Sequence, residues 1–149
     1  MFNNFSKNWK YLEDQGIISN QEYINATFTQ HYRTVEEFRA PFDNKNSAIS
    51  KSGLVLKSCE TMITECPYKI HYLNNKNTMS PHDYAKTLIP TMRSWSETVF
   101  RNALVNRTDR EINEIVDKFY NLYIDEVSND PEGHAMDYVH VIMDIEKAY

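Results

Sequence analysis

The feature that most limits how this chain can fold is a long amphipathic segment near its C-terminal end, residues 109–127. Apolar side chains recur there every three or four positions, so a helix would carry them as one broad stripe. The residues of the stripe are Ile112, Ile115, Val116, Phe119, Leu122, Tyr123 and Val127. Thr108 or Asp109 is placed to cap the start of the helix. A stripe of this width has to be buried, so other helices or a sheet must cover it.

Three short helices are predicted in the first third of the chain. Phe5, Trp9 and Leu12 recur at helical spacing and place the first helix over residues 3–15. The next two start at capping boxes, in which a Ser or Thr is followed three residues later by Glu. We expect them over residues 19–29 and 34–40, the latter ending ahead of Pro41 because proline disfavours helix in the residue before it.

A longer helix is predicted over residues 80–104. Ser80 is a good capping residue, and Pro81 suits the first helical position because its missing N–H has no helical partner there in any case. Pro90 is expected to break or kink this helix, since proline removes one backbone hydrogen bond and clashes with the preceding turn.

Two strands are predicted, over residues 54–65 and 137–146, and the first has room for a β-bulge. Two strands alone make a marginal sheet, so they pair antiparallel with each other or join a larger sheet. Residues 43–52, 68–72 and 74–78 are predicted to be a loop, a short extended piece and a turn-rich loop. The fold class that follows is α+β and mostly helical.

Length and composition favour one domain over residues 1–149. The net charge is −5 and no basic stripe is present, which argues against nucleic acid as a partner. No run of about 18 apolar residues occurs, and the first ten residues lack the apolar core of a signal peptide. We therefore expect a cytoplasmic protein without a membrane span, in which Cys59 and Cys66 are reduced thiols.

The common catalytic and metal-binding patterns are missing from the sequence. The three glycines, Gly16, Gly53 and Gly133, are far apart, so they cannot form a phosphate or cofactor loop. The five histidines are scattered, which argues against a metal site. No nucleophile elbow surrounds any serine. No catalytic residue can be assigned from these patterns.

One stretch of the long helix carries two distinct faces. Arg93 and Glu97 are four residues apart, so they can form an ion pair on one helix face. Met92, Trp95 and Val99 occupy another face. Met and Trp together form an adaptable apolar wall that suits a small organic ligand. On spacing alone, however, a stripe that only packs in the core is the better interpretation.

Several short motifs follow one another in a fixed order along the chain. They are Trp9, Leu12, Gly16-Ile17-Ile18, Tyr32-Arg33-Thr34-Val35-Glu36-Glu37, Gly53-Leu54, Met92-Arg93-Ser94-Trp95-Ser96-Glu97, Phe119-Tyr120-Asn121-Leu122-Tyr123 and Tyr138-Val139. In this order they resemble the C-terminal part of the S-adenosylmethionine-dependent carboxyl methyltransferases known as the SABATH family.

The resemblance implies a fold and a site. In the family this region supplies substrate-capping helices and the last two strands of a Rossmann-like sheet. The helix with the Met92-Arg93-x-x-x-Glu97 pattern lines the acceptor pocket, so Met92 and Trp95 would bind the small-molecule acceptor, a carboxylate in many members. The family has a small aliphatic residue where this chain has Trp95, which implies a narrower or differently shaped pocket.

The same resemblance implies that the chain is inactive alone. S-adenosylmethionine is the cofactor of the complete enzyme, and the half that binds it matches no part of this sequence, so no cofactor is expected to bind this chain alone. Activity would need that half in cis or from a methyltransferase core as partner. The alternative is a non-enzymatic interaction or regulatory module that docks on a related methyltransferase, or a homodimer, because two lone strands expose an edge for strand addition.

Overall fold

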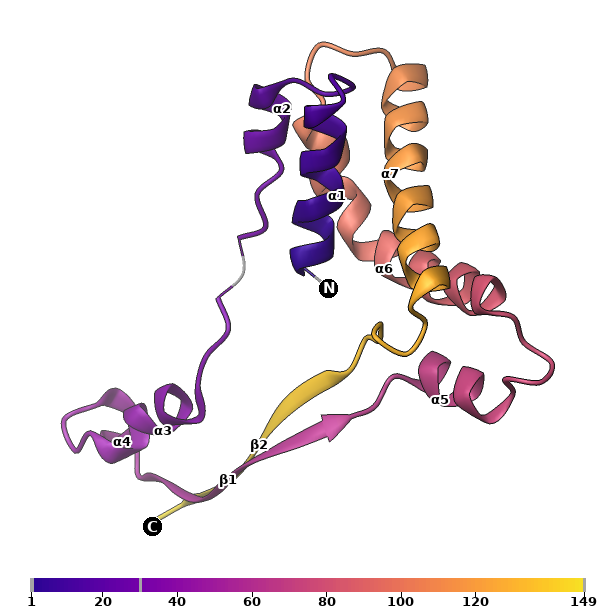
Figure 1. Cartoon of the computed structure of the whole chain (residues 1–149). Coiled ribbons are helices and arrows are strands. Elements are labelled where there is room, and N and C mark those ends of the chain that lie inside the picture. Colours follow the sequence, from indigo (N-terminus) through magenta and orange to yellow (C-terminus); the bar gives the residue numbers. More distant parts are fainter. Residues whose placement is uncertain (1, 30, 149) are drawn as a thin grey trace. The chain divides into compact units, whose positions relative to one another are not determined.

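The computed structural model describes residues 2–29 and 31–148, which form an α+β structure that is mostly helical (Figure 1). These residues group into two compact units, each assembled from two separate stretches of chain. Within the described part, the helical unit comprises residues 2–28 and 66–136, and the sheet unit comprises residues 29–65 and 137–148. The prediction of one domain was made from chain length, which does not indicate how the residues group into compact units.

The helical unit contains five helices. They are α1 (Phe2–Asp14), α2 (Asn20–Asn25), α5 (Pro67–Asn74), α6 (Pro81–Ala103) and α7 (Asp109–Asn129). Helices α6 and α7 form the most extensive pair, α1 packs against α7, and both α2 and α5 pack against α6. The predicted amphipathic segment is therefore helix α7, covered on its apolar side by α1 and α6.

The apolar stripe of α7 forms the centre of the core of this unit. Val116, Phe119 and Val127 are fully buried, whereas Ile112 and Leu122 at the edges of the stripe are only partly so. The Phe119 ring lies 4.2 Å from that of Phe100 on α6, centroid to centroid. Other fully buried side chains come from α1 and α6, namely Trp9, Leu12, Tyr84, Leu88, Ile89 and Met92. Aromatic rings packed at these distances contribute stability beyond the area that they bury.

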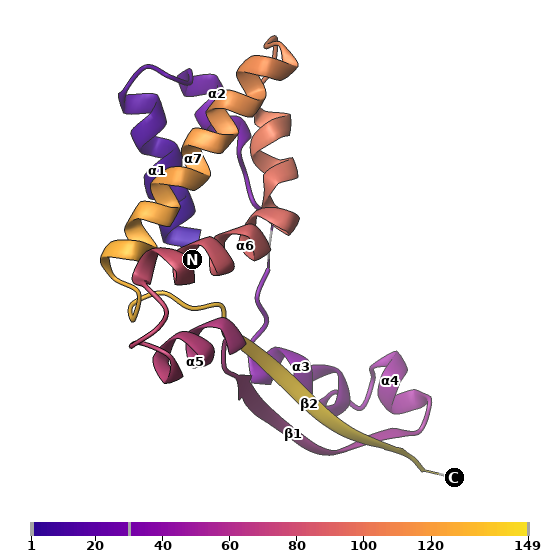
Figure 2. The same ribbon diagram turned by 90° about the vertical axis from the view of Figure 1, so that its right-hand side faces the viewer.

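Helix α6 continues through Pro90 without a break, and it changes direction part-way along its length (Figure 2). The prediction of a kinked helix is thus confirmed. A capping box at Ser80 and Asp83 closes its first turn, with Pro81 at the first helical position as predicted. Proline at position 90 has no N–H to donate to the preceding turn, which lets the two halves of the helix tilt.

Capping boxes also start α2 and α3 (Val35–Asp43) as predicted, but both helix ends differ from expectation. Helix α2 stops at Asn25 instead of residue 29, because the Thr27 hydroxyl donates to the carbonyl of Ile24, an alternative to further helical bonding. Helix α3 runs through Pro41 to Asp43, since a proline costs one hydrogen bond without ending a helix in every context.

The sheet unit holds α3, α4 (Ala48–Lys51), β1 (Leu54–Thr64) and β2 (Tyr138–Lys147). The strands pair antiparallel, as predicted, in the only sheet formed by the described residues. The β-bulge for which β1 has room lies between Leu56 and Ser58. Helices α3 and α4 pack against β1. The prediction of a loop over residues 43–52 was wrong in part, because these residues include the short helix α4. The Ser47 hydroxyl caps this helix by accepting from the N–H of Ser50.

The segment after β1 is also corrected. Strand β1 ends at Thr64, and Cys66 occupies the N-cap position of α5. Residues 68–72, predicted to be extended, lie in α5 and follow Pro67 at its first turn. Cys59 and Cys66, both within the described part, are not joined by a disulfide, as predicted.

Candidate functional site

Trp95 lies on α6, beyond Pro90, and its side chain is only partly covered. It is 37% exposed, and its ring packs at centroid distances of 5.9 to 6.2 Å against Phe2, Phe5 and Phe28. Two of these rings belong to α1, and the third follows α2 in sequence. We call Phe2, Phe5, Phe28 and Trp95 the aromatic cluster. Phe5 is buried, whereas the partly covered Phe2, Phe28 and Trp95 form an apolar surface that solvent can reach.

Met92 has a different environment, although it lies three residues before Trp95. Its side chain has no exposed surface and belongs to the core of the helical unit. Three residues of helix correspond to about 300° of rotation, so the two side chains point about 60° apart. The structure therefore does not bring Met92 and Trp95 together on one exposed face: Met92 supports the core behind it, and Trp95 reaches the surface.

A hollow of about 190 Å³ lies on the same unit. Its lining includes Phe5 and Phe28 of the aromatic cluster together with Trp9, Tyr23 and Phe100. Complete pockets for drug-sized ligands measure roughly 300–1,000 Å³, so this hollow suits a ring or a short substituent. Because Phe5 and Phe28 also contact Trp95, the hollow and the exposed indole are parts of one aromatic surface.

Sequence reasoning missed the aromatic residues that surround Trp95 and the hollow. Phe5 was expected only to serve the first helix, and Phe28 was assigned no role. The available signal is the high aromatic content of the first 28 residues. That signal does not say which rings meet α6, because the contact joins segments that are far apart in sequence.

Arg93 and Glu97 form the predicted ion pair, with 2.6 Å between Nε and Oε2. Arg93 also reaches Asp117 of α7 at 2.7 Å, and its guanidinium lies 5.1 Å from the centre of the Tyr120 ring. Hydrogen bonding to Arg93 holds the pKa of Glu97 below its usual value. These contacts tie α6 to α7 next to Trp95, so they fix the backbone from which the indole projects.

Ser96 and Tyr120 form a buried hydrogen bond within this α6–α7 contact. The two hydroxyl oxygens are 2.7 Å apart, and the Ser96 hydroxyl also lies 2.7 Å from the carbonyl oxygen of Met92, which accepts from it. Burial raises the pKa of Tyr120 to about 12, so the phenol stays protonated at neutral pH. Both polar groups are satisfied internally, which marks them as structural.

Glu22 and Arg107 form a second polar contact that the sequence did not predict. The carboxylate of Glu22 is buried and accepts from the guanidinium of Arg107 at 2.5 and 2.7 Å. It also accepts from the backbone N–H of Ser19, while Arg107 donates to the carbonyl of Ile17. The Arg107 hydrogen bonds lower the pKa of Glu22 to about 2. The capping box predicted the bond between Glu22 and Ser19. It could not predict the bond to Arg107, which lies 85 residues further along the chain.

The side chains that the structure describes do not gather into a metal centre. They contain no group of three or more His, Cys, Asp or Glu residues that could hold a metal ion. His134 is engaged by Asn4, at 3.2 Å from its Nδ1, and burial lowers its pKa. Among the described residues, no helix is both long enough and apolar enough to cross a membrane.

Comparison with known proteins adds no assignment. No model of a known protein family matches the sequence, and no curated protein is similar to it. Any functional assignment therefore depends on the order of the motifs and on the geometry of the aromatic surface.

Proposed function

We propose that this chain is the C-terminal, substrate-capping portion of an S-adenosylmethionine-dependent methyltransferase of small molecules, inactive without a cofactor-binding half. The observation that carries the proposal is the partly exposed Trp95 beside an aromatic hollow, on the helix where the ordered motif series resembles an acceptor-binding helix. The fold supports it in coarse form, being mostly helical with two antiparallel strands.

A capping segment contributes to methyl transfer by positioning the acceptor and excluding water. Orientation of two reactants can account for a large part of a barrier, and a closed apolar site prevents competing hydrolysis. Trp95 and Phe28, backed by the buried Phe5, offer an apolar surface for the ring or chain of an acceptor. Arg93, paired with both Glu97 and Asp117, ties α6 to α7 beside it. The side chain of Met92 is enclosed, so its role is to support that surface.

The residues of this chain do not fit the cofactor itself. Its three glycines lie in separate parts of the sequence, so no backbone cradle for the cofactor can form from them. We therefore assign no residue of this chain to the cofactor, and the partner half has to supply that site. Both strands have an unpaired edge among the described residues, which suits strands that extend a larger sheet.

Acceptor binding by the 149-residue chain tests the proposal. We would measure saturation-transfer NMR signals of aromatic carboxylates, with the corresponding aromatic amines for comparison. Trp95→Ala should abolish the signals because it removes the exposed indole of the aromatic cluster. Tyr11→Ala is the matched control: Tyr11 lies on α1 with 45% exposure and, unlike Trp95, does not belong to the aromatic cluster. Loss of binding in both variants, or in neither, would contradict the assignment of Trp95.

Cofactor binding and recombination test the other half of the proposal. Titration with labelled S-adenosylmethionine should show no stoichiometric binding to the chain alone. Addition of a methyltransferase core that lacks its C-terminal part should restore methyl transfer, and Trp95→Ala should raise the KM for the acceptor. Tight binding of the cofactor by the chain alone would show that a cradle exists and that the proposal is wrong.

A second candidate function is a non-enzymatic module that docks on a related methyltransferase. The observation in its favour is the sheet unit, where Ile63 and Val139 are 64% and 68% exposed although both are strand residues. Large exposed apolar side chains that lie together mark interaction surfaces. The two candidates differ in recombination: a docking module would bind the core without restoring methyl transfer.

A further inference from the structure

Strand β2 has an open edge along its length. In the described part of the sheet unit it pairs on one side only, with β1. Helices α3 and α4 pack against β1 and so cover part of the first strand. From Val139 onward, the outer edge of β2 therefore has no partner strand among the described residues, which makes it a template for another strand.

We propose that the edge of β2 pairs antiparallel with β2 of a second copy of this chain, around a two-fold axis that passes through Ile142. The result is a continuous four-stranded sheet with β1 strands at its outer edges. Closed two-fold dimers use one self-complementary patch on both subunits, so the sequence of β2 itself has to complement its own reverse. In this register, both faces of β2 complement the same face of its reversed copy.

The odd-numbered residues of β2 supply the apolar face. With the axis at Ile142, Val139 stands opposite Ile145 of the second copy, and Val141 opposite Met143. Each pair occurs twice because of the symmetry. Side chains directly opposite on neighbouring antiparallel strands have Cβ atoms about 4.5–5.5 Å apart, close enough for apolar contact. Val139 and Ile145, now exposed, would lose much of that exposure.

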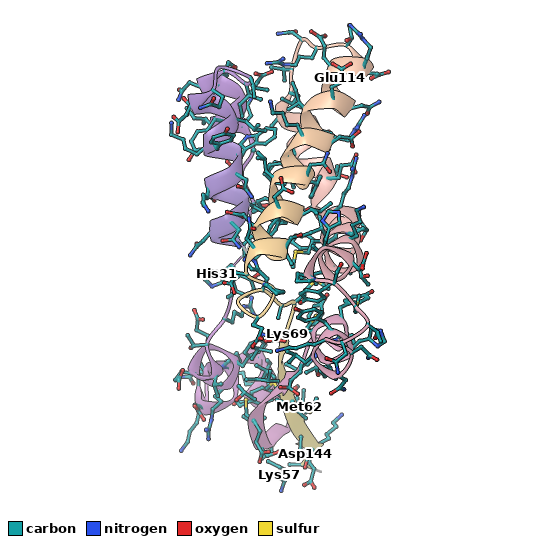
Figure 3. All side chains as sticks on the ribbon, turned by 45° about the vertical axis from the view of Figure 1, so that its right-hand side comes forward. His31, Lys57, Met62, Lys69, Glu114 and Asp144 are labelled. Carbon is teal, nitrogen blue, oxygen red and sulfur yellow. The ribbon has the colours of Figure 1, made fainter. Side chains whose placement is uncertain are left out.

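The even-numbered residues supply the more polar face and its hydrogen-bonding complementarity. Ile142 meets its own copy on the axis, and His140 stands opposite Asp144 on both sides of it. Figure 3 labels Asp144 near the end of the ribbon, close to Lys57 of β1. Asp144 and His140 are exposed, and an imidazole N–H of His140 can donate to the carboxylate of Asp144 across the two strands.

Neighbouring registers are less favourable. An axis at Met143 would place Ile142 opposite Asp144 and Val139 opposite Lys147, which pairs apolar with charged side chains. An axis at Val141 would place His140 opposite Ile142 and lose both His140–Asp144 pairs. A sheet register is well determined only where the side chains distinguish it, and here they select the axis at Ile142.

This dimer does not rest on the proposed function. A second copy can occupy the β2 edge whatever the helical unit binds. A methyltransferase core that supplied a strand to the same edge would exclude the second copy, so the two occupants compete. Association of the chain with itself can be measured without cofactor or acceptor, so its failure would leave the proposed function untouched.

Cysteine cross-linking tests the register directly. In a Cys59→Ser background, Ile142→Cys places two thiols next to each other on the axis, and mild oxidation should give a covalent dimer. Val139→Cys is the matched control, because Val139 is the more exposed of the two positions. The two copies of position 139 would be about 20 Å apart along the strands, too far for a disulfide. Val139→Cys cross-linking as fast as Ile142→Cys would overturn the register.

Charge variants test the association without a covalent bond. Light scattering should give twice the 17.6 kDa mass of the chain for the unmodified protein. The His140→Asp variant and the Asp144→Lys variant should each be monomeric. An equal mixture of the two variants should form a mixed dimer, because the introduced lysine of one variant then faces the introduced aspartate of the other. Glu60→Lys on β1, with the same change in charge as Asp144→Lys, should leave the dimer intact. A folded, monomeric unmodified chain at all concentrations would overturn the proposal, as would a mixture that stays monomeric.

Discussion

The buried carboxylate of Glu22 should make the stability of the helical unit depend on acid. Its pKa is lowered from 4.5 to about 2, chiefly by the hydrogen bonds from Arg107. A carboxylate with a depressed pKa stabilises the fold fully above its unfolded pKa, and that contribution is lost as pH falls through the folded pKa. The shift corresponds to about 3 kcal/mol at neutral pH, lost between about pH 4.5 and pH 2.

Glu22→Gln removes this contribution at every pH. Arg107 then keeps the carbonyl of Ile17 as a partner but loses its countercharge, and its side chain is 25% exposed, so water compensates in part. We expect the free energy of unfolding at pH 7 to fall by about 2–3 kcal/mol. The difference between the variant and the unmodified protein should shrink toward zero as the pH approaches 2.

Urea unfolding monitored by tryptophan fluorescence at pH 7, 5 and 3 measures both quantities. Glu111→Gln provides the control, because Glu111 occupies the same position in the capping box of α7 and is only partly buried. The Glu111→Gln substitution should lower the free energy of unfolding by only a fraction of the loss caused by Glu22→Gln. Equal losses of stability in the two variants at pH 7 would refute the role of burial. A Glu22→Gln variant as sensitive to acid as the unmodified chain would refute the link to its pKa.

Three further substitutions test the packing. Phe119→Ala should cost about 3–5 kcal/mol, and Trp95→Ala distinctly less because the indole is partly exposed; equal denaturation midpoints would remove the basis for an acceptor surface. Ser96→Ala leaves the Tyr120 hydroxyl buried without its partner and should lower the free energy of unfolding in urea by about 1–3 kcal/mol. Tyr120→Phe should cost less, because the Ser96 hydroxyl keeps its bond to the carbonyl of Met92. Gly53→Ala places a side chain at φ +77° with its Cβ 3.0 Å from a backbone oxygen, so hydrogen exchange of β1 should accelerate; unchanged exchange would show that the turn can relax.

Local sequence signals predicted much of the fold. The stripe of α7 follows from apolar spacing, and the four predicted capping residues, Ser19, Thr34, Ser80 and Thr108, do cap the free N–H groups at their helix starts. These signals act within one or two helical turns, so they can be recognised without knowledge of the rest of the fold. The bulged antiparallel strand pair followed in the same way from alternation.

The errors arose where local signals conflict. Residues 68–72 were predicted to be extended, but Pro67 just before them suits the first turn of a helix, and α5 begins there. The third helix was predicted to end before Pro41, but α3 continues through it to Asp43. A single proline fixes one φ angle and removes one donor, which leaves both outcomes open. Packing of α3 against β1 and of α5 against α6 decides between them.

The candidate site shows the same limit at the level of side chains. Helical spacing placed Met92 and Trp95 near each other, but the boundary between buried and exposed positions on α6 falls between them. That boundary is set by Phe2, Phe5 and Phe28, which cover one side of the indole and leave the other open.

The two units differ in how far they bury their own apolar residues. The helical unit encloses the stripe of α7 and leaves Trp95 as a partly exposed aromatic surface. The sheet unit leaves Ile63, Val139 and Ile142 at least half exposed in a two-stranded sheet, which is marginal by itself. Burial of these residues requires further strands or a covering surface, from a second copy or from a methyltransferase core. The stability of the sheet unit should therefore rise with protein concentration, whereas that of the helical unit should not. Hydrogen exchange of the β2 and α7 amides over a hundredfold range of concentration separates the two, and equal, concentration-independent protection of both would contradict this expectation.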